Sequence, residues 1–272
     1  MFKSKKKKSK TGGSVKETAS MVLPGRFDAD VSMVTDVGCV RELNEDSGTY
    51  VQPDDQEVLK SKGLLVVVAD GMGGHNAGEV ASSLAVKAIG EFLADGTPAS
   101  LNVLDEALRQ ANDHILTIAG EKPDYTGMGT TVAAVYLRER EAVYAHAGDS
   151  RVYLWHKGEI RQLTRDDSWV AAAMNGFAED PREMEQHPMR HVLTKVVGLR
   201  PELQPSVAEC AFVSGDVLLL CSDGVHGSVS DDKLEELLGS RKPVATVAES
   251  VIREALAHGA TDNVTAVVIR RD

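Results

Sequence analysis

Residues 130–163, TTVAAVYLREREAVYAHAGDSRVYLWHKGEIRQL, decide the fold of this chain. The stretch predicts four successive strands, because apolar, β-branched and aromatic runs are separated by short polar turns. These strands are expected at 130–137, 142–146, 151–156 and 158–163. Strands joined by tight turns pair antiparallel, whereas parallel strands need a long crossover connection. The centre of the protein is therefore expected to be antiparallel sheet.

The remainder of the chain supplies further strands and a set of helices. Strands are predicted at 29–35, 63–69, 207–212, 216–221 and 264–269. Helices are predicted at about 76–93, 100–119, 167–175, 231–238 and 243–257. Two consecutive helices followed by four strands do not match the alternation of a parallel doubly wound sheet. The order favours an α+β fold, a four-layer α-β-β-α sandwich of two antiparallel sheets flanked by helices.

Composition is that of a globular protein, with 42% hydrophobic and 26% charged residues among 272. No apolar run approaches the roughly 20 residues that a membrane-spanning helix needs. The three cysteines, Cys39, Cys210 and Cys221, are too far apart for a metal motif, which predicts a reducing, cytoplasmic location. Residues 27–272 are expected to form one catalytic domain.

The charge of the chain is unevenly distributed. Net charge is −11, yet the first 16 residues carry seven lysines and no acid, which leaves −18 on the remainder. The basic segment 1–26 is predicted to be a disordered tail without a secretory signal. It is either simply solvated or makes a weak contact with an anionic surface. The acidic body argues against nucleic acid as a partner.

Three carboxylates lie at the ends of buried strands. Asp70 follows the apolar run 64–69, Asp223 follows LLLCS, and Asp262 precedes VTAVVI. A buried carboxylate without a partner is costly, so each is expected to pair or to bind a cation. A single Asp-Gly pair would indicate only a turn. Three acids at strand ends make a metal site a competitive hypothesis.

Further polar residues come from two other segments. The stretch TDVGCVRELNEDS, 35–47, contains Arg41, Glu45 and Asp46. Neighbouring side chains point to opposite sides of an extended chain, so it stays open whether both acids reach one ion. The planar guanidinium of Arg41 suits two phosphate oxygens. Asp149, in HAGDSR, would by itself indicate a Gly-Asp turn.

The candidate ligands are oxygen atoms, which favours Mg²⁺ or Mn²⁺ over Zn²⁺. His187 and His191 are spaced i,i+4 but lack a companion acid, so they indicate zinc only weakly. No cysteine is followed six positions later by arginine, and the G-x-S-x-G and Walker A patterns are absent. The glycine loop after Asp70 does not have dinucleotide-binding spacing.

Six motifs, RELNED, VADGMGGHNAGEVAS, TGMGTT, AHAGDSR, LLLCSDGV and TDNVTAVV, occur in this order. Together they resemble the bacterial form of the metal-dependent protein phosphatase family, type 2C, over about residues 28–270. The resemblance implies the same sandwich and a hydrolase acting on phosphoserine and phosphothreonine in proteins. It implies direct attack by a water that bridges two Mn²⁺ or Mg²⁺ ions, without a phosphoenzyme. The partner would be a serine/threonine kinase or its targets, and we expect a monomer.

The same resemblance assigns ligands to the two core ions. Asp70 would bridge both ions. Glu45 and the carbonyl of Gly71 would join it at one ion, and Asp223 and Asp262 would hold the other.

Four more residues match motif positions of the family. Arg41 would bind the substrate phosphate, and Asp46 would act on the metals largely through water. Asn263 would support the last metal ligand. Asp149 would belong to a third, weaker metal site.

One position departs from the eukaryotic pattern, in which a histidine follows the first Asp-Gly. Here that residue is Met72, and His75 is the candidate to protonate the leaving oxygen. A loop-orienting role for His75, or metal-bound water as the acid, stays open. Residues 166–198 resemble the mobile flap of the family, in which Trp169 is expected to pack.

Three functions compete on this evidence. The leading hypothesis is a serine/threonine protein phosphatase. A phosphodiesterase or nuclease using the same metals is disfavoured by the acidic body and the single phosphate-type arginine, Arg41. A non-catalytic binding module is disfavoured because every metal-binding acid is present.

Overall fold

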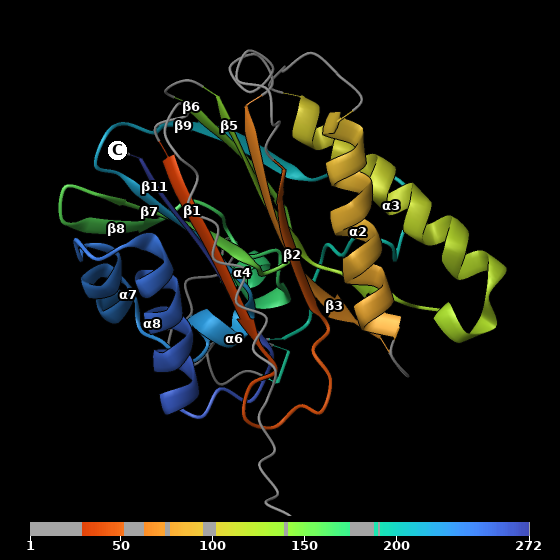
Figure 1. Cartoon of the computed structure of the whole chain (residues 1–272). Helices are drawn as coiled ribbons and strands as arrows, with labels where there is room; N and C mark the ends of the chain where they lie inside the picture. The colour runs from red at the N-terminus through yellow and green to blue at the C-terminus, as the bar shows by residue number, and fades with distance from the viewer. Residues whose placement is uncertain are drawn as a thin grey trace, which may run out of the picture.

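The computed structural model describes residues 29–51, 63–73, 77–94, 102–138, 141–174, 188–189 and 191–271. Two antiparallel sheets lie face to face between two layers of helices (Figure 1). The predicted four-layer sandwich is confirmed. The predicted tail, His75 and His187 lie outside the described residues.

The first sheet has the strand order β1-β11-β10-β7-β8. Its members are β1 (Ala29–Asp36), β11 (Val264–Arg271), β10 (Val217–Cys221), β7 (Arg151–His156) and β8 (Glu159–Gln162). Three helices cover its outer side: α6 (Asp223–His226), α7 (Asp231–Leu238) and α8 (Val244–Ala257). Helix α8 packs mainly on β1 and β11, because its buried residues repeat at helical spacing on one face.

The second sheet has the order β2-β3-β5-β6-β9, with a short β4 paired to β3. Its members are β2 (Asp46–Val51), β3 (Leu64–Met72), β4 (Gly129–Thr130), β5 (Val132–Arg138), β6 (Glu141–Ala147) and β9 (Ser206–Ala211). Helices α2 (Ala77–Ala94) and α3 (Val103–Glu121) cover its outer side, and η1 (Pro123–Tyr125) follows α3. Helix α4 (Trp169–Met174) lies in the predicted flap.

Successive side chains of β3 face two different buried surfaces, which explains why its sequence is apolar throughout. Leu65 and Val67 pack against the helices, whereas Val66 and Val68 pack between the two sheets. A strand that is buried on both faces loses the usual alternation of apolar and polar residues. The same reasoning applies to β10, which is buried along its whole length.

Three elements at the functional end of the sandwich differ from prediction. The sequence did not predict strand β2, because DSGTYV has little apolar character. Pairing with β3, in which Asp46 lies opposite Asp70, keeps this segment extended. Helix α6 is only four residues long and therefore shows no helical period. The predicted strand 130–137 is split at Thr131, whose backbone N–H bonds to the carbonyl of Asp70.

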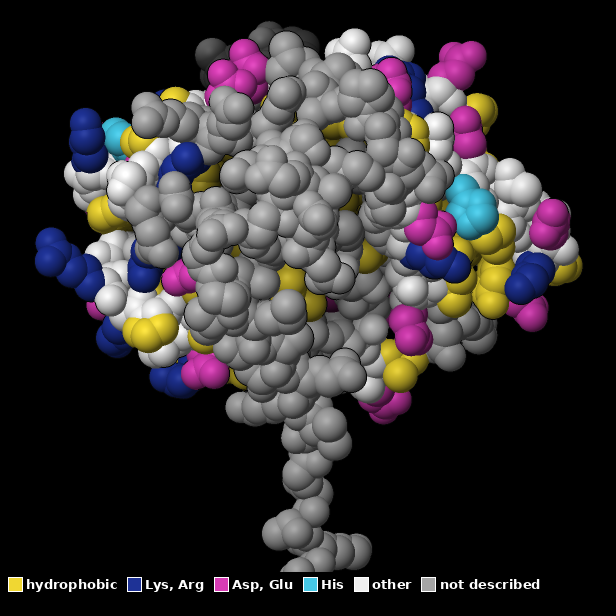
Figure 2. Space-filling model, turned by 45° about the horizontal axis from the view of Figure 1, so that its top comes forward, with side chains coloured by type: hydrophobic (Ala, Val, Ile, Leu, Met, Phe, Trp, Pro, Cys, Tyr) yellow, Lys and Arg dark blue, Asp and Glu magenta, His cyan; other side chains and the backbone are white. Residues whose placement is uncertain are grey.

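The described surface carries both basic and acidic side chains. Basic and acidic side chains are interspersed along both flanks of the face shown in Figure 2. Within the described residues, no helix is both long enough and apolar enough to span a bilayer.

Candidate functional site

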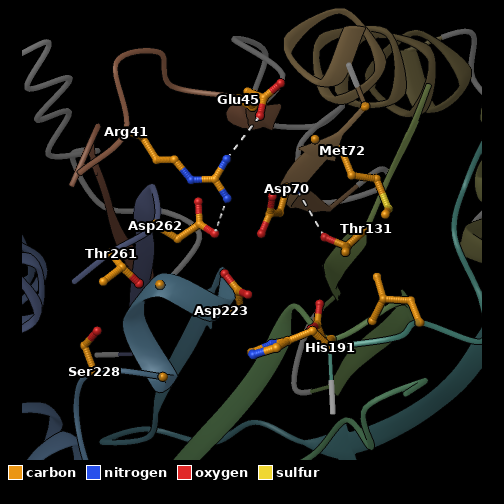
Figure 3. A pocket seen from close by; sticks show the side chains of 16 residues that line it. Arg41, Glu45, Asp70, Met72, Thr131, His191, Asp223, Ser228, Thr261 and Asp262 are labelled. Atoms are coloured by element: carbon orange, nitrogen blue, oxygen red, sulfur yellow. Dashed lines mark hydrogen bonds and ion pairs between the residues drawn. The ribbon is translucent and has the colours of Figure 1, made fainter. Parts of the chain in front are cut away.

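A cleft of about 610 Å³ lies at one end of the sandwich. Seven of the residues predicted from the sequence line it: Arg41, Glu45, Asp70, Gly71, Asp149, Asp223 and Asp262 (Figure 3). Asp46 and Asn263 are buried and do not line it. The structure thus brings together residues from five separate segments of the chain.

Antiparallel pairing explains why these acids converge. The end of one strand lies beside the start of its neighbour within each sheet, and the packing of the two sheets then brings the acids of both to one edge of the sandwich. Asp46 begins β2 directly opposite Asp70 near the end of β3. Asp223 follows β10, and Asp262 precedes β11, the strand paired with β10. Asp149 lies in the turn between β6 and β7.

The backbone of Asp70 is held on both sides. Its N–H donates to Thr131 Oγ1 at 3.1 Å, and its carbonyl accepts from Thr131 N and Thr130 Oγ1, both at 2.8 Å. The carboxyl group is buried among other carboxyl groups. Burial first, and then the charges of Asp46 and Asp223, raise the pKa of Asp70 well above its usual range.

The neighbouring acids are perturbed in the same direction. Burial, followed by the charge of Asp223, raises the pKa of Asp149 to about 7. Burial likewise raises the pKa of Asp46 to about 7, against hydrogen bonds from Thr265 and Ser222. Burial and the charge of Asp262 raise the pKa of Asp223. A cluster of this kind stores like-charge repulsion, which a bound cation would relieve.

Two buried oxygen atoms show that the cluster is incomplete without a cation. Asp46 Oδ1 and Asp223 Oδ1 have no hydrogen-bond partner within the described structure. Each such atom costs about 1–3 kcal/mol unless something satisfies it. The donors are hard oxygens, which suit Mg²⁺ or Mn²⁺.

The described residues do not form a ready-made cage of three or more His, Cys, Asp or Glu side chains. The fit of this cleft to divalent cations rests instead on its hard oxygen donors and on the two buried carboxylate oxygens that lack a partner among the described residues.

Arg41 provides the cationic side of the cleft. Its Nη2 atom lies 2.8 Å from Asp262 Oδ2 and its Nη1 atom 3.9 Å from Glu45 Oε2 (Figure 3). The side chain is 48% exposed, so it is accessible to a ligand. A guanidinium group has five donors, which leaves several for the oxygen atoms of an anion.

Gly71 and Gly78 pack against each other beneath Glu45. A Cβ atom on Gly71 would lie 2.0 Å from the carbonyl oxygen of Gly78, and one on Gly78 would lie 2.4 Å from Glu45 Oε1. The N–H of Gly78, in the first turn of α2, donates to the Glu45 carboxylate. A helix N-terminus favours a negative charge, so α2 fixes this acid.

Asn263 holds the loop 37–45, which carries Arg41 and Glu45. Its Nδ2 donates to the carbonyl oxygens of Val37 and Leu43, both at 2.9 Å, and its Oδ1 accepts from Glu45 N at 2.8 Å. Sequence reasoning placed Asn263 only beside a metal ligand. The hydrogen bonds that it makes to a loop more than 200 residues away could not be read from its position in the motif.

We expect Asn263→Ala to unfold more easily and to lose function. Three buried hydrogen bonds disappear, which costs about 3 kcal/mol of stability, and the loop 37–45 loosens. Loss of such a supporting contact is expected to lower kcat/KM about 10- to 100-fold. Thermal unfolding and steady-state kinetics measure the two effects.

Asn112→Ala is the matched control for that variant. Asn112 is also buried and bonded, through Nδ2 to Arg200 O at 3.0 Å and through Oδ1 to Gly198 N at 2.8 Å. It should be destabilised to a similar extent with a much smaller kinetic loss. Equal kinetic losses in the two variants would show that Asn263 acts only through global stability.

Three residues at the cleft were missed or assigned differently. Gly78 was not singled out, although the GE pair that opens a helix after a glycine loop was available as a signal. Ser222 donates to Asp46 Oδ2 at 2.7 Å, which orients that acid. His191, considered only for zinc, lines the cleft together with Asp223 (Figure 3).

The start of the predicted flap is tied to the Asp149 turn. Asp167 N donates to Gly148 O at 2.9 Å, and Lys195 Nζ pairs with Asp167 Oδ1 at 2.8 Å. On the other side, His226 Nε2 lies 3.0 Å from the carbonyl oxygen of Asp149. The turn is thus held between the flap and α6.

Comparison with known sequences identifies the family of this chain. Residues 42–260 match the model of the family described as Protein phosphatase 2C. The chain is 33% identical over 244 residues to the serine/threonine phosphatase stp of Listeria monocytogenes, a match that covers 88% of this chain and 94% of that one. It is 34% identical to the protein phosphatase PhpP of Streptococcus pneumoniae, covering 88% and 96%.

Solved structures share the fold. The serine/threonine phosphatase PstP/Ppp of Mycobacterium tuberculosis superposes with a TM-score of 0.79 at 36% identity, covering 90% of this chain and 99% of that one. The catalytic domain of the serine/threonine phosphatase PstP in complex with two manganese ions superposes with a TM-score of 0.77 at 35% identity, covering 89% and 97%.

Proposed function

The chain belongs to the protein phosphatase 2C family and is a metal-dependent serine/threonine protein phosphatase, and we propose that its chemistry takes place in the cleft around Asp70. The observation that carries this assignment is the buried Asp70 carboxyl group surrounded by further acids, two of which have an unsatisfied oxygen atom. A purely structural role would not require so many carboxylates close together.

The assignment of ligands follows the grouping of the acids. Asp70 would contribute to holding two Mn²⁺ or Mg²⁺ ions; the PstP relative is solved in complex with two manganese ions. Glu45 and the Gly71 carbonyl would hold one ion, and Asp223 and Asp262 the other. When bound, the ions lower the pKa of water and offset the charge of the phosphoryl group.

Asp149 is proposed to hold a third ion. It lines the same cleft, and its backbone is held by His226 on one side while the turn is tied to Asp167 on the other. Its raised pKa, about 7, marks a carboxylate that is destabilised without a cation.

The remaining polar residues act on substrate or on the ligands. Arg41 would bind two oxygen atoms of the phosphate, exchanging part of its present pairing with Asp262. Asp46, oriented by Ser222, would hold the site through hydrogen bonds beneath Asp70. Asn263 positions the Arg41 loop. The proposed role of His75 as proton donor concerns a residue outside the described part of the chain.

The biological setting is proposed by analogy with the relatives. Bacterial proteins named serine/threonine phosphatases support phosphoproteins as substrates, and we propose a serine/threonine kinase or its targets among them. We further propose a cytoplasmic monomer. A weak contact of the lysine-rich tail with an anionic surface is proposed on charge alone.

Removal of the metal tests the function directly. We expect the full chain with Mn²⁺ to release phosphate from a phosphothreonine peptide and from a small aryl phosphate, because both reach the same cleft. A chelator should abolish both activities, and added Mn²⁺ should restore them, as measured by released phosphate. A protein that binds Mn²⁺ yet releases phosphate from neither substrate would refute the catalytic assignment.

A further inference from the structure

Large apolar side chains that are exposed gather around the cleft. Of the eight such side chains in the described residues, one lines the cleft, and five more lie on segments that line it or are hydrogen-bonded to such a segment. We call these six the apolar rim: Val40, Leu43, Met72, Trp169, Met189 and Val192. Exposed apolar groups that concentrate at one place mark an interaction surface more often than scattered ones do.

The rim borders the acidic centre on two sides. Val40 and Leu43 flank Arg41 in the loop 37–45, and Val40 is 66% exposed. Met72 lines the cleft itself on the side opposite Asp262 (Figure 3). A polypeptide whose phosphorylated residue reached Asp70 would therefore meet apolar side chains as it left the cleft.

The flap carries the other part of the rim. Val192 lies between His191 and Leu193, which both line the cleft. Its carbonyl accepts from Trp169 N at 2.8 Å, and its N–H donates to Met189 O at 3.0 Å. Backbone contacts therefore hold Trp169, Met189 and Val192 together at one border of the cleft.

Two members of the rim, Leu43 and Met72, have backbone groups that are hydrogen-bonded or paired within the fold. Leu43 is held through its carbonyl by Asn263, and Met72 is paired with Gly129 in the sheet. Because these side chains are already placed, a bound peptide would bury them at a small cost in backbone order. Such sites discriminate between partners by the shape and polarity of a few contacts.

Charge limits what can lie against the rim. The chain beyond its first 16 residues carries −18, and it stays strongly negative, at −14, when two divalent ions are added. Acidic groups beside the substrate phosphate would be repelled by this field, while serine or glycine flanks would bury little apolar surface. Apolar flanks satisfy both conditions.

We propose that the apolar rim contacts the substrate residues on both sides of the phosphorylated serine or threonine, so that the enzyme prefers phosphoprotein segments with apolar flanks. This substrate class rests on the proposed function and deepens it. The rim acts on peptide binding, while the acids and Arg41 act on the phosphoryl group.

The test compares phosphothreonine peptides of equal length that differ only at the flanking positions. With Mn²⁺, the wild-type chain is expected to hydrolyse the Leu/Val-flanked peptide with a kcat/KM about 10-fold above that of the Ser-flanked peptide. Glu-flanked and Lys-flanked peptides should both fall below the Leu/Val-flanked one. Equal values for Leu/Val and Ser flanks, or a higher value for Lys flanks, would overturn the proposal.

Variants then locate the preference on the protein. In the double variant Val40→Ser, Val192→Ser, the ratio of kcat/KM for the Leu/Val-flanked peptide to that for aryl phosphate should fall about 10-fold, mainly through KM. Val213→Ser is the matched control, since Val213 is also exposed, at 37%, but lies between β9 and β10, away from the cleft. It should keep the wild-type ratio.

Different outcomes would refute the rim proposal and the phosphatase assignment. A control variant that loses as much preference as the rim variant would overturn the rim proposal and leave the phosphatase assignment intact. Hydrolysis of aryl phosphate with no peptide preference would do the same. Absence of Mn²⁺-dependent hydrolysis of every substrate would refute the proposed function, and the rim proposal with it.

Discussion

Replacing Asp70 by asparagine is expected to lower kcat/KM about 10³-fold and, at the same time, to stabilise the metal-free protein. The activity falls because the amide supplies no charge to hold two cations together. The metal-free protein gains because one of several mutually repelling carboxylates becomes neutral and can donate a hydrogen bond. Steady-state kinetics with Mn²⁺ and thermal unfolding with a chelator measure the two effects.

The pH dependence of the stability effect has a defined sign. The pKa of Asp70 is raised in the folded state, so that state binds this proton more tightly than the unfolded chain does. The stability of the metal-free protein therefore falls as pH rises through the folded pKa. Asp70→Asn should remove that loss. At pH values above 7, the Tm of the metal-free variant should exceed that of the wild type by at least about 3 °C.

Asp216→Asn is the matched control, because it makes the same change at another buried aspartate. Asp216 precedes β10 at the end away from the cleft, and its carboxylate pairs with His156 and accepts from Val213 N at 2.9 Å. The variant should lose about 2 kcal/mol of stability and keep its kcat/KM within about 2-fold. A metal-free Asp70→Asn protein less stable than wild type would contradict the repulsion argument.

Gly78→Ala is expected to reduce activity at limiting Mn²⁺ about 100-fold while the protein still folds. The new Cβ atom would lie 2.4 Å from Glu45 Oε1, so the carboxylate must move. This oxygen is the far end of a flexible side chain and can yield, but a displaced Glu45 would hold its ion poorly. The Cβ atom would also lie 2.9 Å from the backbone carbonyl carbon of Gly71, so the variant should lose some stability as well. Mn²⁺ titration of activity should show a higher half-saturating concentration with partial rescue at high Mn²⁺.

Gly120→Ala in α3 provides the comparison for that variant. A Cβ atom on Gly120 meets nothing within 4 Å, and alanine favours a helix over glycine by up to about 1 kcal/mol. This variant should be as stable as wild type or more so, with unchanged Mn²⁺ dependence. An unchanged Mn²⁺ requirement in Gly78→Ala would remove Glu45 from the set of metal ligands.

Local sequence patterns predicted many of the strands and helices. Strands joined by turns such as HKG predicted antiparallel sheets, and the apolar spacing within 243–257 predicted α8 to within one residue of its start. These elements could be predicted because burial imposes a period of two or 3.6 on the sequence. Strand β2 and helix α6 could not, since pairing with β3 and four residues of helix leave no such period.

By itself, the sequence determined which residue types stand at strand ends, and this already predicted a carboxylate site for hard cations. Only the tertiary structure decided how they meet: Asp46 opposite Asp70, Gly78 beneath Glu45, and Asn263 holding the Arg41 loop. The physical reason is that periodicity and residue type are local properties of a chain. Pairing register, close backbone approach and hydrogen bonds between distant segments arise only when the two sheets pack.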